Sequence, residues 1–313
     1  MSDRQPILDF SCINEKKFVD IPSSKPAVPL TLTAVGVTNR PITLTLADPF
    51  NAQPITVPCL LTVHCSLHAE QRGLHMSRIE ESFDELRGAG LQISEFVSVL
   101  TELLRTSQNQ DHCAVSLETQ HEHRVSKNPS GKSSIELIKF LASVEKNSHR
   151  TICKNGIEVP FMNACPCTQR WGMREFYNTL TSQGYEAKNA EAIVRSAPLQ
   201  AHTNRGTARL SIASSAVTFP ELYDTLDSAV PIIRELLKGQ DEHAFVSAAH
   251  RAGQFCEDNA RAIVKSVAER FGPYVAPETP VEVQVEVDES VHFHNLRACY
   301  SGTIAEVCAQ CVR

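Results

Sequence analysis

The chain has 313 residues, of which 42% are hydrophobic and 21% charged, the composition of an ordinary globular protein. At this length it can bury one large core or two medium ones, and two domains are the better expectation. The net charge of −6 argues against a general nucleic-acid binder and against a membrane-surface protein. A local cluster of Lys and Arg can still hold a nucleotide.

The 11 cysteines are an odd number and are scattered over the chain. Residues 1–6 lack the basic and then apolar pattern of a secretory signal peptide. Free thiols in a reducing cytoplasm are therefore expected. The longest uncharged stretch, residues 49–69, contains three prolines and its apolar residues alternate, so it predicts strands and no membrane helix.

In the first half of the chain, strand patterns precede helical ones. Residues 1–26 mix charge, Ser and Pro and predict an extended lead-in. Alternation within residues 30–46, with Thr on the second face, predicts an antiparallel sheet with one buried side, and residues 60–67 predict a further strand. The apolar spacing then becomes helical, which predicts helices at residues 79–86 and 93–104.

The middle of the chain returns to strands. Residues 113–119 predict a strand, and residues 135–144 predict a short helix that closes the first half. Residues 170–197 are polar and helix-biased and predict an inserted excursion. Residues 207–213 alternate as a strand.

The remaining patterns repeat the order of the first half. Helices are expected at residues 222–237 and 252–271, and strands at residues 281–287 and 298–307. Each half is then predicted to contain a strand pair, two helices and a second strand pair, in that order. The sequences of the two halves show no residue-level repeat. We expect an antiparallel α+β fold whose halves meet near residues 146–150.

The most informative motif is Cys165-Pro166-Cys167. A thiolate at Cys165 and imidazoles at His202 and His292, with a carboxylate at Glu242, are ligands that zinc or ferrous iron accepts. A catalytic site of this type needs three or four protein ligands and one open position. Buried thiols and satisfied histidines explain the same residues, and the pattern alone leaves both interpretations open.

Three other segments contain candidate functional residues. Residues 72–78 lie at a strand-to-helix transition, where His75 can transfer protons and Arg78 can contact phosphate. A plain capping turn is the favoured alternative there. Glu257 lies on an amphipathic helix and on spacing alone is a solvated residue. Residues 308–311 hold a Cys pair, for which a strand end is favoured over a metal or redox site.

Six motifs in this order resemble the type IB GTP cyclohydrolases and their archaeal relatives. They are Arg72–Arg78, Ala164–Cys167, His202–Gly206, Leu236–Glu242, Phe255–Asp258 and Glu289–His292. Because they span nearly the whole chain in family order, the resemblance is specific.

The resemblance implies a tunnelling fold, in which antiparallel sheets carry paired helices on one side. Each chain then holds two modules, residues 27–148 and residues 149–313, and the second contains the metal ligands. It also implies homotetramers with active sites at subunit interfaces.

By motif position, the resemblance also implies roles for individual residues. The implied metal ligands are Cys165, His202, Glu242 and His292. Glu257 is implied as the purine anchor, with His75, Glu289 and His294 as the proton-transfer or supporting groups. Charge and position add three triphosphate contacts: Arg78, Arg205 and Lys238.

The implied reaction is hydrolysis of GTP at C8. With a divalent metal (Fe²⁺, Mn²⁺ or Zn²⁺), water attacks C8, formate leaves and a 7,8-dihydroneopterin phosphate forms for pterin and folate biosynthesis. Thr168-Gln169 and the long interval to His202 are more similar to the archaeal branch, whose product is the 2′,3′-cyclic phosphate instead of the triphosphate. The alternatives are a non-hydrolytic purine- or pterin-binding protein and another tunnelling-fold enzyme acting on a related purine.

Overall fold

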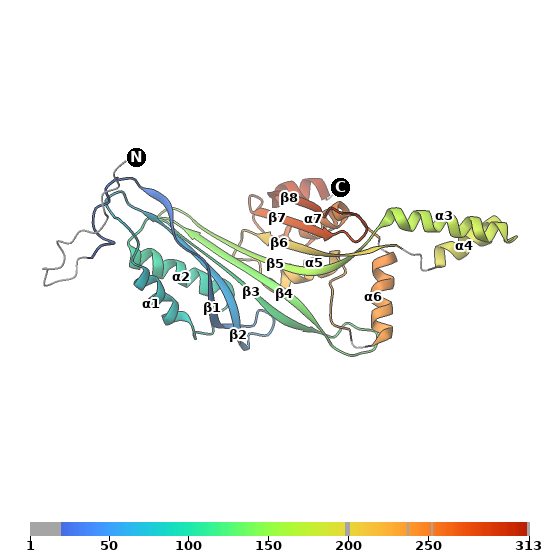
Figure 1. The fold of residues 1–313 in the computed structure, drawn as a ribbon, viewed down its shortest axis with the longest axis horizontal. Helices are drawn as coiled ribbons and strands as arrows, with labels where there is room; N and C mark the ends of the chain where they lie inside the picture. The colour runs from blue at the N-terminus through green and yellow to red at the C-terminus, as the bar shows by residue number, and fades with distance from the viewer. Residues whose placement is uncertain (1–19, 198–200, 237, 252, 312–313) are drawn as a thin grey trace, which may run out of the picture.

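The computed structural model describes residues 20–197, 201–236, 238–251 and 253–311. Eight strands form one antiparallel sheet in chain order (Figure 1). The first half contains β1 (Leu32–Ala47), β2 (Pro54–Leu67), α1 (Met76–Leu86), α2 (Ile93–Gln108), β3 (Cys113–Val125) and β4 (Ser134–Lys146). The second half contains β5 (Thr151–Ala164), α3 (Pro166–Ser182), α4 (Ala187–Ser196), β6 (Thr203–Ile212), α5 (Phe219–Ala229), α6 (Gly239–Arg251), α7 (Cys256–Phe271), β7 (Pro280–Asp288), β8 (Leu296–Thr303) and α8 (Ile304–Cys311).

One face of this sheet is apolar from strand to strand. Phe140, Ile157, Leu210 and Val283 lie on four successive strands, each directly paired with the next, and all are buried. Directly paired residues share a face, so the alternation read from the sequence produces one continuous apolar surface. Helices α2, α5 and α7 contact the strands, and their buried residues join this surface in a single core.

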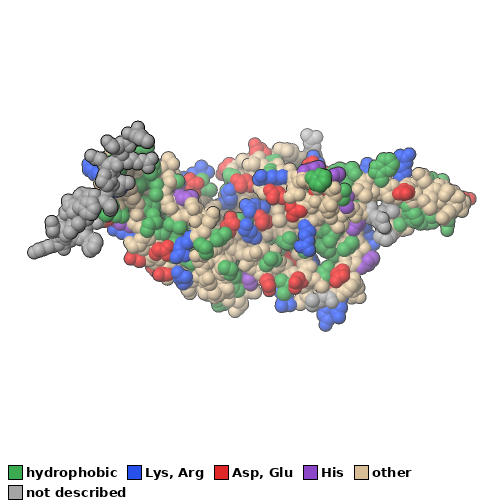
Figure 2. Space-filling view, viewed as in Figure 1, with side chains coloured by type: hydrophobic (Ala, Val, Ile, Leu, Met, Phe, Trp, Pro, Cys, Tyr) green, Lys and Arg blue, Asp and Glu red, His purple; other side chains and the backbone are tan. Residues whose placement is uncertain are grey.

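The opposite face is polar and charged. Lys154 Nζ lies 2.9 Å from Glu282 Oε1, and Arg209 Nη2 lies 2.7 Å from Glu158 Oε2. A cavity of about 380 Å³ opens on this face. On the side of the molecule drawn in Figure 2, basic and acidic side chains are interspersed. An antiparallel sheet with paired helices on one side is the arrangement of the predicted tunnelling fold, so the fold-class prediction is confirmed.

Helices α3 and α4 form a hairpin that projects beyond the sheet at one end of the molecule (Figure 1). The hairpin has an apolar cluster of its own, in which Leu180, Ala190 and Val194 are buried against Phe176 and Tyr177. The helical prediction for residues 170–197 is therefore confirmed, and the excursion packs largely on itself.

One predicted helix is wrong, and a second is correct only in its first part. Residues 135–144 belong to strand β4, whose alternating burial follows a period of two. The helix predicted at residues 222–237 ends at Ala229, and the chain continues extended with bridges from Ile232 to Phe161 and from Glu235 to Ile135. Pro231 stops the helix, because proline has no N–H to donate and disfavours helical backbone in the preceding residue.

The strand predicted at residues 298–307 is also wrong beyond Thr303, where α8 begins. The Thr303 hydroxyl accepts the N–H of Glu306 at 3.3 Å, and the Glu306 carboxylate accepts the N–H of Thr303 at 2.7 Å. This reciprocal cap starts a helix. Cys308 and Cys311 therefore lie one turn apart on α8, and their placement at a strand end was wrong.

The predicted lead-in falls mostly outside the described residues. Its described part, residues 20–26, includes a turn in which Ser24 N donates to Ile21 O at 3.0 Å, so this part is not extended.

The predicted module boundary at residues 148/149 lies between β4 and β5, which pair directly, so the sheet continues across it. The division into modules stays a prediction. Among the described helices, none is long and apolar enough to cross a membrane.

Candidate active site

The predicted site residues fall at two ends of the sheet. His75 follows β2, near the end where Cys113 pairs with Cys65. Cys165 and His202 flank the pair Ala164–Thr203 at the opposite end of β5 and β6. Because β5 has 14 residues, these ends lie roughly 45 Å apart at ~3.3 Å per residue. One chain therefore does not bring His75 and Arg78 to the Cys165 end.

Cys165 precedes α3, whose first residue is Pro166. Its N–H donates to the carbonyl of His202 at 3.1 Å, which joins the two motifs through the backbone. Burial raises the pKa of the Cys165 thiol, but hydrogen bonds from Thr168, Cys167 and the His202 side chain outweigh it and hold the pKa below the usual value for cysteine. Backbone N–H groups at the start of a helix favour a thiolate in this way.

His202 lies among polar side chains from β6 and from the end of β7. Its Nδ1 is 3.4 Å from Asn204 Oδ1, 3.4 Å from Ser290 Oγ and 3.8 Å from Glu289 Oε1. The Asn204 amide also donates to Glu289 Oε1. These contacts orient the imidazole, as outer partners commonly do for histidines in metal sites.

The carboxylate of Glu289 is not fully satisfied. Its Oε2 is buried and has no hydrogen-bond partner among the described residues. A buried carboxylate oxygen without a partner is costly, and a cation or a donor group of a ligand would satisfy it. Cys165 therefore meets His202, and His202 meets Glu289. Thiol, imidazole and carboxylate are the donor types that a divalent metal accepts.

The four predicted ligands do not assemble within the described part of this chain. No group of three or more His, Cys, Asp or Glu side chains there is placed to hold a metal ion. His292 is exposed after β7, with its ring stacked on His294 at 5.3 Å between centroids. Figure 2 shows histidine side chains in the region between β7–β8 and the α3–α4 hairpin.

Glu242 lies in the first turn of α6, and the far end of this helix meets the Cys165 region. There His250 Nε2 is 3.3 Å from the carbonyl of Ala201. Glu242 and His250 are eight positions apart, or about 12 Å along the helix. The buried Asp241 fixes the first turn by accepting the N–H and hydroxyl of Ser130 at 2.9 and 2.6 Å. The metal role of Glu242 stays a prediction, as does the phosphate role of the neighbouring exposed Lys238.

Glu257 lies in the first turn of α7, at the same end of the sheet as Cys165. Gln254 N donates to Ala164 O at 3.1 Å, and Asn259 Nδ2 donates to Asn163 Oδ1 at 3.1 Å. The start of α7 is thus held against the end of β5, and Glu257 is exposed there. Arg205 lies on β6 with the parity of Arg209, so it belongs to the polar face of the sheet.

Asn204, Ser290 and Thr168 are site residues that the sequence analysis missed. Asn204 carried a usable signal, because it follows His202 by two positions and strand residues two apart share a face. Thr168 is three residues beyond Cys165, the spacing at which a helix N–H faces the residue before the helix. Ser290 had no such signal, since its contact with His202 joins segments 88 positions apart.

Three comparisons relate this chain to known proteins. The family described as type I GTP cyclohydrolase folE2 matches residues 18–298. GTP cyclohydrolase MptA of Methanococcus maripaludis is 28% identical over 309 residues, covering 92% of this chain and 96% of that protein. The MptA of Methanocaldococcus jannaschii is 27% identical over 302 residues with the same coverage. The structure of uricase from Arthrobacter globiformis aligns with a TM-score of 0.47 and 9% identity, covering 87% of this chain and 94% of that one.

Proposed function

This chain belongs to the type I GTP cyclohydrolase family, folE2, and is therefore an enzyme that acts on GTP in pterin biosynthesis; from this premise we propose a metal-dependent hydrolysis at C8 that releases formate. The observation that supports this reaction is the contact of His202 with both Cys165 and Glu289, together with one buried Glu289 carboxylate oxygen that has no partner among the described residues. The product is a 7,8-dihydroneopterin phosphate.

Cys165 and His202 would hold the metal, with His292 and Glu242 as the remaining proposed ligands. Thiolate, imidazole and carboxylate donors suit Fe²⁺, Mn²⁺ or Zn²⁺. Bound there, a divalent ion supplies the Lewis acidity that makes water a nucleophile near neutral pH. Asn204 and Ser290 keep the His202 ring in place, so the orientation of the imidazole is already fixed before the substrate binds.

Glu257 binds the purine in this proposal. A carboxylate accepts two N–H groups from a guanine edge, and the start of α7 is fixed to β5 beside Cys165. Holding the base there places C8 next to the reacting groups and replaces an encounter in solution with a fixed geometry. Glu289 and His294 are proposed to move protons, and Arg78, Arg205 and Lys238 to contact the phosphates.

The direct test is anaerobic incubation with GTP and Fe²⁺, Mn²⁺ or Zn²⁺, followed by mass detection of formate and pterin. We expect one formate for each GTP consumed, and no turnover after chelation of the metal. A product lighter than the triphosphate, with the mass of the cyclic phosphate, would assign the chain to the archaeal type of reaction. GTP binding without formate under every metal would instead support the non-hydrolytic alternative.

We also propose that the site forms between chains of a cytoplasmic homotetramer. His75 and Arg78 lie at the end of the sheet opposite to Cys165, so a site that uses both groups needs His75 from a second chain. In symmetric oligomers the same pair of surfaces repeats, so each interface would complete one site.

Mixing two inactive variants tests this arrangement. His75→Gln and Cys165→Ala should each be inactive alone, whereas mixed oligomers should recover about one quarter of wild-type activity, because random pairing leaves that share of sites with both residues intact. Native mass spectrometry verifies that the chains have mixed and counts them. Mixed oligomers without activity would mean that His75 and Cys165 do not act from different chains.

A further inference from the structure

A turn near the start of the chain is attached to the segment that contains His75. Arg72 N donates to Ser24 O at 2.9 Å, and Gly73 N donates to Pro22 O at 3.1 Å. Lys25 Nζ also lies 2.5 Å from Glu70 Oε2. Residues 20–25, named here the N-terminal turn, are therefore fixed against the 70–75 loop by backbone bonds and an ion pair.

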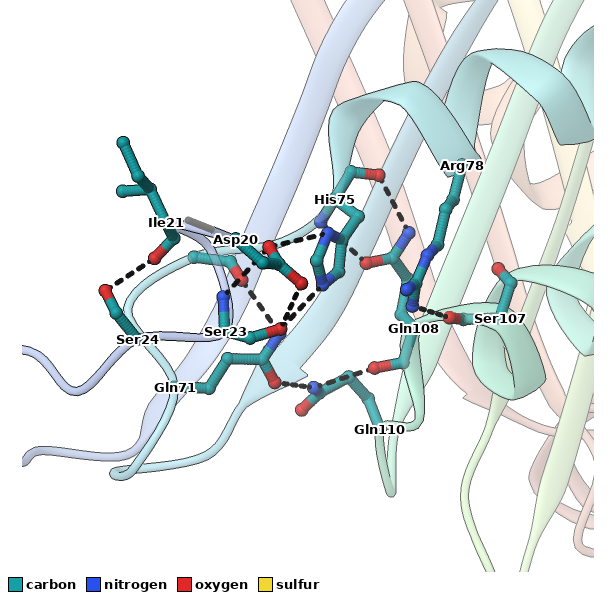
Figure 3. A network of polar contacts seen from close by, with 11 residues as sticks. Asp20, Ile21, Ser23, Ser24, Gln71, His75, Arg78, Ser107, Gln108 and Gln110 are labelled. Atoms are coloured by element: carbon teal, nitrogen blue, oxygen red, sulfur yellow. Dashed lines mark hydrogen bonds and ion pairs between the residues drawn. The ribbon is translucent and has the colours of Figure 1, made fainter. Parts of the chain in front are cut away.

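This turn brings an acid and a hydroxyl to the His75 ring (Figure 3). Asp20 Oδ1 lies 3.6 Å from Nδ1, and Ser23 Oγ lies 3.2 Å from Nε2. Ser23 Oγ also lies 2.8 Å from Asp20 Oδ2, which closes a triangle of three side chains. The His75 side chain is 12% exposed, so little water competes for its nitrogens.

The hydrogen atoms in this triangle can be assigned by counting donors. The hydrogen bond from Ser23 first, and then the charges of His75 and Arg78, hold the pKa of Asp20 below its usual range, so Asp20 is an acceptor at neutral pH. The Ser23 hydroxyl donates its only proton to Asp20. Its oxygen can therefore only accept a hydrogen bond from His75 Nε2. The Ser23 contact therefore needs a proton on Nε2, and the charge of Asp20, 3.6 Å from Nδ1, favours a proton on that nitrogen as well.

The backbone of His75 is fixed from the other side. Its N–H donates to Gln108 Oε1 at 2.9 Å, and its carbonyl accepts from Gln108 Nε2 at 3.0 Å. A cavity of about 590 Å³ opens beside the ring. The other charged or titratable groups on that cavity are His68, Glu70 and Arg78, of which Glu70 pairs with Lys25 and Arg78 donates to Ser107 O.

We propose that Asp20 and Ser23 are positioning residues that hold His75 as a doubly protonated proton donor facing this cavity; the proposal rests on the GTP hydrolysis described above. When a C8–N bond of the purine breaks, its electron pair goes to the nitrogen. That nitrogen takes the proton from His75 Nε2 in place of Ser23, and His75 is left neutral. The ring then regains a proton from solvent, and Asp20 keeps Nδ1 protonated throughout.

Asp20→Asn tests the proposal in the full-length enzyme. We expect kcat to fall about 10- to 100-fold, part of the 10²–10⁴-fold that general acid catalysis contributes, with the KM for GTP within about twofold. The activity loss on the alkaline side of the pH profile should begin at lower pH, because the variant no longer favours the charged ring. Asp20→Glu should restore part of the rate, and Ser23→Ala should shift the profile in the same direction.

The matched control is Lys25→Ala, which removes an ion pair from the same turn without touching His75. It should keep the wild-type rate and pH profile. If Lys25→Ala loses as much activity as Asp20→Asn, attachment of the turn explains the effect and the proposed positioning is wrong. An unchanged pH profile in Asp20→Asn would overturn it as well.

A titration by NMR separates this proposal from the proposed reaction. In protein labelled with ¹⁵N-histidine, the His75 signals are those missing in His75→Gln. They should lose the doubly protonated form at lower pH in Asp20→Asn than in wild type. A wild-type enzyme that releases no formate would contradict the proposed reaction. The titration would still decide whether Asp20 pairs with His75. Identical titrations in the two proteins would overturn the pairing itself.

Discussion

Cys165→Ala is expected to lower formate release by at least about 100-fold, since loss of an outer partner in a metal site alone costs 10- to 100-fold. Cys165 has the soft donor atom among the proposed ligands, and its sulfur lies among the N–H groups that begin α3. Alanine keeps the backbone bond to His202 but offers no donor atom. Metal content after dialysis and formate yield per GTP are the measurements.

The fold should survive this change. Cys165 lies outside the buried core, so we expect the free energy of unfolding to change by less than about 1 kcal/mol. Cys167→Ala is the matched control, because Cys167 is exposed two positions away and should keep both metal and activity. Full metal retention in Cys165→Ala would contradict its role as a ligand.

Arg234→Met is expected to destabilise the protein by about 3–5 kcal/mol, the usual cost of leaving one partner of a buried ion pair uncompensated. Glu136 is completely buried, and Arg234 Nη2 lies 2.8 Å from its Oε1. Tyr223, whose own pKa is raised by burial and by Glu136, donates its hydroxyl to Glu136 Oε2 at 2.6 Å. Methionine has a similar length and no charge, so it isolates the loss of the counter-charge. Denaturant unfolding measures the effect.

This destabilisation should depend on pH in one direction. Burial raises the pKa of Glu136, although Tyr223 and Arg234 oppose it. A carboxyl whose pKa is higher in the folded state stabilises the fold at acidic pH, and that contribution disappears as pH rises through the folded-state pKa. Without Arg234 the pKa should rise further, so the loss in Arg234→Met is largest at pH 7 and above. It should shrink toward about pH 4, near the pKa of glutamate in an unfolded chain.

Two comparisons make the ion-pair interpretation testable. Arg209→Met removes a pair with Glu158 on the polar face, where both side chains keep contact with water, and should cost at most about 1 kcal/mol. Combining Arg234→Met with Glu136→Gln should recover part of the stability, because no buried charge remains. A loss in Arg234→Met that does not change with pH would mean that packing is the cause.

Much of the fold could be predicted from periodicity. Alternation in β1 and β7 and helical spacing in α2 and α7 describe which side of each element is buried, and burial on one face follows from these local patterns. Strand β4 was mistaken for a helix because a short apolar run satisfies both periods. Only its pairing with β3 and β5 decides between them.

Only part of the candidate site could be predicted from the sequence. The motifs around Cys165 and His202 were visible in the sequence, and the structure brings those two residues together. Asp20 lay in a segment expected to be an extended lead-in, and its contact with His75 crosses 55 positions of the chain. The cluster of Glu289 with His202 depends likewise on the pairing of β6 with β7.

The sequence by itself determined the order of the motifs, the types of reactive side chain and the apolar face of most elements. These properties are local, because a helix or strand repeats within a few residues and a motif holds its own chemistry. Only the tertiary structure decided which residues meet. Strand register places Cys165 and His202 at one end of the sheet, and the N-terminal turn places Asp20 beside His75 at the other. The strand length between the two ends is the physical reason that a site using both groups needs more than one chain.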